Sequence, residues 1–107
     1  MSAEQVMQAI SQFCKNQSGD PQTWQGNKST YQWNRGRDTD SGTINGVVRK
    51  VAGIDVQGNK IWVVAGSFKI GADGAILRFT GLPQKFQSML FNVGTIQNQI
   101  HPVTSEV

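Results

Sequence analysis

Few side chains in this 107-residue chain are of the types that catalyse reactions or bind metals. There is one histidine, His101, which lies near the C-terminal end beside Pro102, and one cysteine, Cys14. Structural zinc sites use four nitrogen or sulfur ligands, so a single Cys and a single His predict no such site. The sequence also lacks a serine elbow, a phosphate-binding loop and a dinucleotide fingerprint. We therefore expect a protein that is not an enzyme and that uses no metal and no cofactor.

The acidic residues are scattered, with one close pair in the run Asp38-Thr39-Asp40-Ser41-Gly42. This run resembles the opening of a calcium loop, but the Glu that closes an EF-hand loop is absent downstream. It also resembles the Asp-x-Asp nucleophile of phosphatases, which should follow a buried strand, whereas the preceding residues are mostly polar. Asp, Ser and Gly are also frequent turn residues. We interpret the run as a turn.

Basic residues suggest binding instead of catalysis. The net charge is +3, and between Trp24 and Lys85 nine Lys and Arg residues face four Asp residues. From Thr30 to Arg37 the residues alternate, so one face of a strand there would be aromatic and basic. Proteins that bind single-stranded nucleic acid combine cations for the phosphates with rings that stack on bases. The candidate nucleic-acid-binding residues are Tyr31, Trp33, Arg35, Arg37, Arg49, Lys69 and Arg78. The alternative is that Tyr31 and Trp33 cap the core while the two Arg side chains reach solvent.

The elements that would position these residues can be read from periodicity. Ser2-Ala3-Glu4-Gln5 matches a capping box, and apolar residues recur at helical spacing as far as Cys14. This predicts a helix within residues 1–18, in which Cys14 is a small buried hydrophobe. Residues 20–29 should form a loop, whose Trp24 is either a lid on the core or a binding platform.

Three runs rich in Val, Ile, Phe and Trp follow, separated by residues that tolerate positive φ. With the run from Thr30 they predict an antiparallel sheet of about four strands over residues 30–82. Gly46 and Gly53 lie inside the second strand, which should therefore be curved or bulged. We expect hairpin turns at Gly58-Asn59 and at Ala72-Asp73. In the third strand we place Trp62 on the core face with Val64, Phe68 and Ile70.

The opposite face of this predicted sheet is too apolar to be freely solvated. Either the N-terminal helix covers it, or a ligand or another chain does. The candidate interface residues are Val47, Val51, Ile61, Val63 and Ile76. A symmetric dimer that places sheet against sheet is the simplest arrangement. The low charged fraction of 16%, with 12 Gln and 7 Asn, is compatible with self-association.

Leu82-Pro83 begins a second amphipathic stretch, which predicts a C-terminal helix over residues 83–93, ended by Gly94. Residues 101–107 should be frayed. The chain is thus predicted to be a single α+β domain over residues 1–107, with an N-terminal helix, a curved antiparallel meander and a C-terminal helix.

By topology, a four-stranded meander followed by a helix resembles the single-stranded-DNA-binding transcriptional coactivators and the plant Whirly proteins. The resemblance implies nucleic-acid binding, although the sequence carries no signature motif of either group and has an additional N-terminal helix. The leading hypothesis is therefore a small binding module for single-stranded nucleic acid. The alternative is a homo-oligomeric structural or interaction protein, such as an assembly or phage-like accessory subunit. A third hypothesis is a carbohydrate or small-molecule pocket lined by Trp24, Trp33 and amides.

The first ten residues lack the basic and apolar pattern of a signal peptide. No apolar segment approaches the roughly 20 residues that span a bilayer. We expect a cytoplasmic protein that does not contact membranes.

Overall fold

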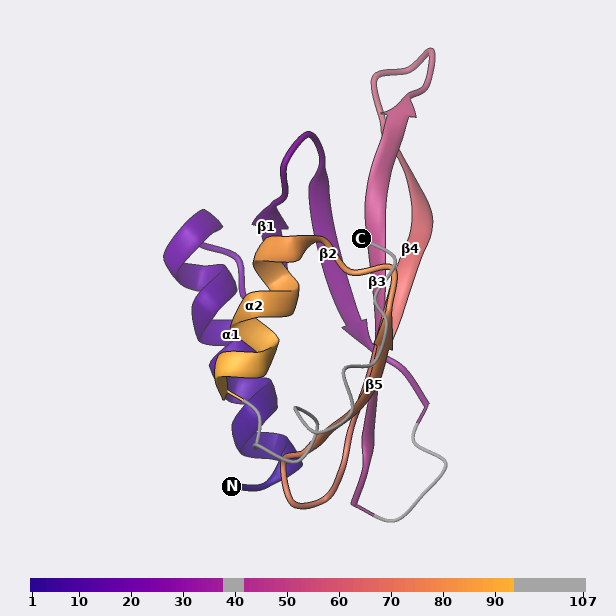
Figure 1. The fold of residues 1–107 in the computed structure, drawn as a ribbon. Coiled ribbons are helices and arrows are strands. Elements are labelled where there is room, and N and C mark those ends of the chain that lie inside the picture. The colour runs from indigo at the N-terminus through magenta and orange to yellow at the C-terminus, as the bar shows by residue number, and fades with distance from the viewer. Residues whose placement is uncertain (38–41, 94–107) are drawn as a thin grey trace.

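The computed structural model describes residues 1–37 and 42–93, which form an α+β fold (Figure 1). The elements are, in order, α1 (Ala3–Ser18), β1 (Thr23–Gln25), β2 (Thr30–Arg35), β3 (Ile44–Ile54), β4 (Lys60–Ile70), β5 (Ile76–Thr80) and α2 (Gln84–Val93). The strands form one antiparallel sheet in the order β1-β2-β3-β4-β5. The predicted fold class is confirmed.

Both ends of α1 are fixed by local hydrogen bonds. The Gln5 N–H donates to the Ser2 hydroxyl at 3.2 Å, and the Ser2 N–H donates to the Gln5 side-chain oxygen at 2.7 Å. The predicted capping box is therefore present. Gly19 ends the helix with φ of 81°, and its N–H donates to the Lys15 carbonyl. Such a left-handed residue closes many helices, and glycine adopts it without strain.

The second helix follows the expected proline. Gln87 donates its N–H to the Pro83 carbonyl at 3.0 Å, so Pro83 takes part in the first turn although α2 begins at Gln84. The predicted stop at Gly94 lies outside the described residues, as do the predicted frayed tail, His101 and residues 38–41 of the predicted turn.

Both helices pack on the same face of the sheet (Figure 1). Trp24 lies at the centre of this packing, fully buried, with its ring 4.2 Å from that of Phe86 on α2 and 5.4 Å from that of Tyr31 on β2. The ring centroid of Phe68 on β4 lies 5.7 Å from that of Phe86. The interpretation of Trp24 as a lid on the core is confirmed.

The sheet has one strand more than the four expected. Trp24 lies in β1, which pairs with β2 through Trp24 and Tyr31 where a loop was predicted. Three residues are too few to show an alternating pattern, and the polar residues around Trp24 hide the strand. The Trp24 side chain is buried in the core, and the backbone of β1 pairs with β2.

The hairpin loops are longer than two residues. Strands β3 and β4 are joined by residues 55–59, in which the Asp55 carboxylate accepts the N–H groups of Gln57 and Asn59. The prediction of a two-residue turn at Gly58-Asn59 is therefore wrong, because it did not count this Asx turn. The loop after β4 contains Ala72 and Asp73 as expected.

The β3–β4 hairpin protrudes beyond the rest of the molecule (Figure 1). Residues 51–66, here called the hairpin arm, include the irregular part of its ladder. Ala52 on β3 and Ala65 on β4 have no cross-strand partner, because the register shifts beside each of them. The predicted irregularity of β3 is confirmed, and β4 has one as well.

Candidate nucleic-acid interface

Cross-strand partners in an antiparallel sheet point to the same face, so the register defines two faces. Trp33 pairs with Val48, Val48 pairs with Gly66, and all three are buried on the helix side. The other face is here called the open face. Its members, by register, include Gln32, Asn34, Asn45, Val47, Arg49, Val51, Trp62, Val64, Ser67, Lys69, Arg78 and Thr80, and Lys60 lies on the same face near the tip of the β3–β4 hairpin, where it pairs with Ile54. The face carries four cations, of which Arg49, Lys69 and Arg78 lie away from the tip, and among the described strand residues it carries no acid.

Arg49 is held at the middle of the open face. Its Cζ lies 5.6 Å from the ring centroid of Trp62, and its Nη2 donates to the Gln32 side-chain oxygen. The Arg49 Nε is buried and has no hydrogen-bond partner in the structure. Stacking on Trp62 and the bond to Gln32 restrict the guanidinium, so less entropy is lost when it binds a further group.

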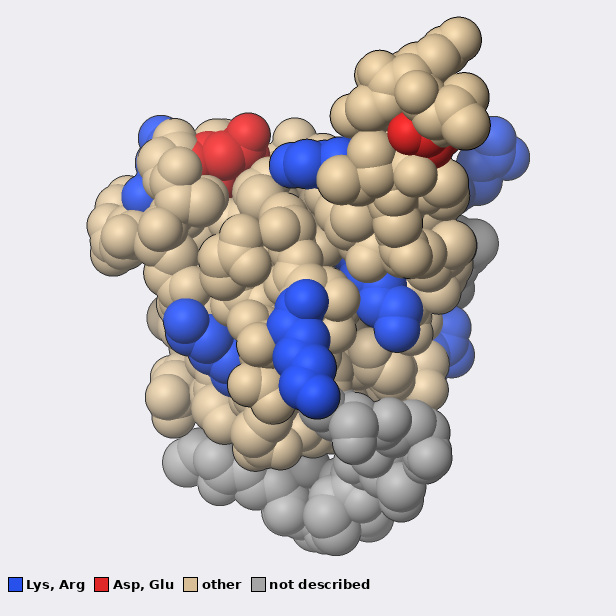
Figure 2. Space-filling view, turned by 90° about the horizontal axis from the view of Figure 1, so that it is seen from above, with Lys and Arg blue, Asp and Glu red and all other residues tan. Residues whose placement is uncertain are grey.

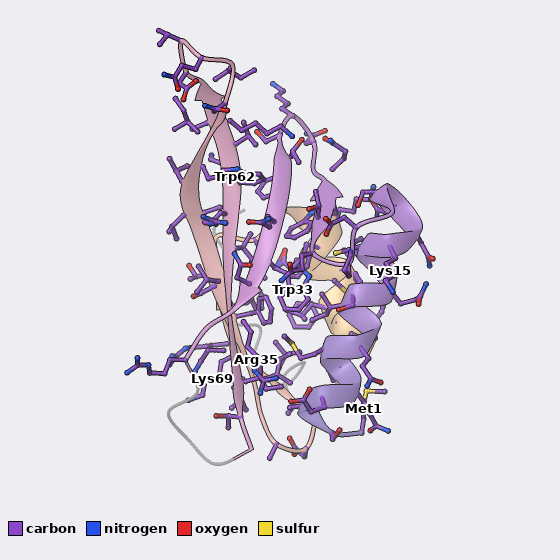
Figure 3. The ribbon with its side chains drawn as sticks, turned by 180° about the vertical axis from the view of Figure 1, so that it is seen from behind. Met1, Lys15, Trp33, Arg35, Trp62 and Lys69 are labelled. Atoms are coloured by element: carbon purple, nitrogen blue, oxygen red, sulfur yellow. The ribbon has the colours of Figure 1, made fainter. Side chains whose placement is uncertain are left out.

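Lys69 and Arg78 form a second basic site on the same face. They are direct cross-strand partners on β4 and β5, and Asn45 on β3 continues the row. Figure 3 shows Lys69 and Trp62 toward opposite ends of the β3–β4 hairpin. The open face therefore has two basic sites joined by amide, hydroxyl and valine side chains.

The aromatic and basic residues of β2 lie on the helix side. Trp33 is 6% exposed, and its Nε1 donates to the Pro21 carbonyl at 3.1 Å. The Arg35 Nη1 donates to the Glu4 carboxylate of α1 at 2.8 Å (Figure 3). The expectation that Tyr31, Trp33 and Arg35 share an uncovered binding face with Arg49 is wrong. The predicted alternation along β2 is present, but the face that carries Tyr31, Trp33 and Arg35 is turned toward the helices.

Of the seven predicted binding residues, the structure therefore brings Arg49, Lys69 and Arg78 onto one open face. Arg37 lies just beyond the end of β2 and is exposed. The capping interpretation of Tyr31 and Trp33 agrees with their positions against the core.

The five predicted interface residues do not form one surface. Val47 and Val51 lie on the open face, where they pair with Ser67 and Trp62. Val63 pairs with Lys50, which pairs with Tyr31, so Val63 lies on the helix side of the hairpin arm, as does Ile61 two residues before it. Ile76 is 1% exposed and belongs to the core. Its predicted position on the second face is wrong.

Two irregularities explain these differences. The unpaired Ala65 breaks the alternation of β4, so Trp62 and Val64 lie on the face opposite to Phe68 and Ile70. The register also shifts between Lys69 and Ile70, which brings Ile76 opposite Ile70 in the core. Sequence reasoning therefore missed Trp62 as a site residue. Gly66 was the available signal, because glycine inside a strand often marks a bulge.

A cavity of about 920 Å³ lies on the helix side at the base of the hairpin arm. Lys50 and Lys85 line it, together with the Tyr31 ring, the start of α2 and the amides of Gln25, Asn27 and Gln84. Figure 2 shows basic side chains spread across this end of the molecule, where acidic ones are fewer. Trp33 instead lines a smaller hollow of about 450 Å³ against α1. Trp24 lines neither of these two cavities.

Cys14 lies in the C-terminal half of α1, against the core, and is fully buried. Burial raises the pKa of its thiol to about 11, which keeps the thiol protonated at neutral pH. Within residues 1–37 and 42–93, no three His, Cys, Asp or Glu side chains are close enough to hold a metal ion. Neither α1 nor α2 has the length and apolarity of a membrane-spanning helix.

Comparison with known proteins gives no relative: no family model, no curated protein and no solved structure matches this chain.

Proposed function

We propose that this protein binds single-stranded nucleic acid across the open face of its sheet. The observation that carries the proposal is the grouping of Arg49, Lys69 and Arg78 with Trp62 on the one face that neither α1 nor α2 covers. Phosphates would lie against the three cations, and a base would stack at the Arg49–Trp62 pair. Aromatic rings and guanidinium planes both accept such stacking.

The residues between the two basic sites are neutral, which fits a nucleic acid that is bound without strong sequence preference. Asn34 and Asn45 present amide groups, and Val47 and Val51 present small apolar surfaces. Bases and sugars offer hydrogen-bonding edges and apolar faces to such a surface.

Fluorescence anisotropy with labelled single-stranded DNA and RNA tests the proposal. One stacked base contributes about 1 to 3 kcal/mol, so Trp62→Ala should weaken binding by about 5- to 150-fold. Arg49→Gln and Arg78→Gln should each weaken binding and reduce its salt dependence.

The matched control is Arg35→Gln, which removes the same charge from the helix side. It breaks an exposed ion pair worth about 1 kcal/mol or less, and it should leave the affinity close to that of the wild type. No detectable binding at low salt would refute the proposal. Equal losses in Arg35→Gln and Arg78→Gln would show that net charge, and not this face, determines binding.

A second candidate function is self-association as a structural or interaction protein. It is favoured by the large apolar side chains exposed on the hairpin arm, including Ile54, Ile61, Val63 and Val64. A sheet-against-sheet dimer through the five predicted interface residues loses its support, since four of them are divided between the two faces of the sheet and the fifth, Ile76, is in the core. Light scattering on a sizing column tests self-association, and a monomer at every concentration would refute it.

A further inference from the structure

The outer edge of β4 is unpaired along the hairpin arm. β5 pairs with β4 only between Ser67 and Ile70, so no described strand continues the sheet beside residues 60–66. The Asp55 N–H donates to the Asn59 carbonyl, which shows that Asn59 faces β3. Backbone groups alternate sides along a strand. Ile61 and Val63 therefore bond toward β3, and the N–H and C=O groups of Lys60, Trp62 and Val64 point to the outer edge.

From Ile61 to Val64 this edge has no proline, no charged residue and no unpaired residue, the features with which proteins prevent strand pairing. Lys60 and the unpaired Ala65 lie at the two ends of this run. Its side chains are apolar and exposed: Val64 by 70%, Ile61 by 44% and Val63 by 39%. Extended backbone with open hydrogen-bonding groups and apolar side chains favours addition of a further strand.

We propose that a second copy of this chain pairs with this edge, antiparallel, about a twofold axis at Trp62. An antiparallel strand is complementary to itself, and this register fits the residue types. Trp62 lies beside Trp62 of the partner subunit on the open-face side. Ile61 lies opposite Val63 of the partner subunit on the helix side, and Lys60 lies opposite Val64 of the partner subunit. All outward backbone groups from Lys60 to Val64 are then paired.

The same register brings the tip of the partner's arm to the cavity beside α2. The Thr80–Gly81 backbone lies directly beside Gly66, so the pairing ends before Gly66 and the tip of the partner's arm is directed past it toward this cavity. The cavity there has a volume of about 920 Å³ and contains Lys50 and Lys85, and the tip loop carries Asp55. Space and opposite charge thus meet at both ends of the pairing.

The free edge of β3 is a weaker candidate. It is unpaired beyond Lys50, but the unpaired Ala52 interrupts it and leaves no regular run of comparable length. Bulges of this kind discourage strand addition. In the proposed dimer the two open faces lie on the same side of one continuous sheet. The dimer does not depend on nucleic-acid binding, and it gives the self-association candidate a defined geometry.

Sedimentation velocity over a concentration series, without nucleic acid, tests the dimer. Val64→Lys places a second cation opposite Lys60 of the partner subunit and should weaken dimerisation at least tenfold. Val64→Glu places a carboxylate at the same point and should dimerise at least tenfold more tightly than Val64→Lys. Val64 is exposed, so both variants should fold, and circular dichroism checks this.

Disulfide trapping tests the position of the axis. Direct partners in an antiparallel pair are about 5.5 Å apart between Cα atoms, within the range that a disulfide bridges. In a Cys14→Ala background, Trp62→Cys should give a covalent dimer on oxidation, whereas Lys85→Cys should not. A wild-type chain that is monomeric at its highest soluble concentration would overturn the proposal. A dimer that is equally stable in Val64→Lys and Val64→Glu would overturn the register while leaving self-association itself intact.

Discussion

At the scale of single residues, burial decides what a side chain can do. A cysteine can react and a tryptophan can bind ligands when they are exposed. Cys14 and Trp33 are instead both buried in the core between the helices and the sheet. Trp62 looked like a core residue from its sequence neighbours, yet it lies on the open face beside Arg49. Alternation along the chain therefore placed Trp62 on the wrong face, whereas for Trp33 it left open a choice between the core and a binding site, which burial decides for the core.

The raised pKa of Cys14 has a measurable consequence for stability. Below pH 9 the thiol is protonated in both the folded and the unfolded chain. Between pH 9.0 and about 11 the unfolded chain loses this proton and the folded chain keeps it, so the free energy of unfolding falls as pH rises. The slope is at most about 1.4 kcal/mol per pH unit.

Urea denaturation of the wild type and of Cys14→Ala at pH 8 and pH 10 measures this contribution. The wild type should lose more stability than the variant between the two pH values, because the variant lacks the thiol and is otherwise identical. The thiol should also resist iodoacetamide in the folded state. Rapid alkylation under native conditions would show that Cys14 is more accessible than its position implies.

At the scale of elements, β4 determines the site. Ala65 has no partner on β3 and divides β4 into two parts. After Ala65, Phe68 and Ile70 face the core, and before it Trp62 lies on the open face. Gly66 makes this possible, since a Cβ there would overlap the Thr80 carbonyl oxygen and the Gly81 backbone. The chain needs glycine here because two strands approach closely beside a bulge.

Gly66→Ala should destabilise the protein by more than about 2 kcal/mol, because the overlapping atoms are backbone and have little freedom to move. The matched control is Gly53→Ala in β3, where a Cβ would have no neighbour within 4 Å. That variant should change stability by less than about 1 kcal/mol and can be stabilising, since it restricts the unfolded chain. Thermal and urea unfolding of both variants measure the difference. Similar losses in the two would refute the close approach at Gly66.

At the scale of the whole molecule, both helices lie on one face and leave the other open (Figure 1). The charge is divided accordingly. Glu4 on α1 pairs with Arg35 on the helix side, whereas Arg49, Lys69 and Arg78 share a face without a described acid. The proposal of a nucleic-acid ligand rests on this separation and not on the modest net charge of +3.

The division of charge predicts the salt dependence of binding. Three phosphate contacts release counterions, so log K for single-stranded DNA should fall with log salt concentration with a slope of about −2. Anisotropy titrations between low and moderate salt measure this slope. Arg78→Gln should make it shallower by about 0.7, in line with one lost contact. A slope near zero would mean that phosphates are not bound, and a much steeper one that the helix side also takes part.

The sequence by itself determined the two helices and the meander of β2 to β5, because the capping box, turn residues and periodicity act over a few neighbouring residues. It also named Arg49, Lys69 and Arg78 as candidate binding residues. Only the tertiary structure decided which face those residues share, since a single bulge exchanges the two faces of a strand and leaves almost no trace in composition. The tertiary structure also decided that Tyr31 and Trp33 of β2 face the helices and that Trp62 of β4 does not, because both orientations depend on contacts between residues far apart in the chain.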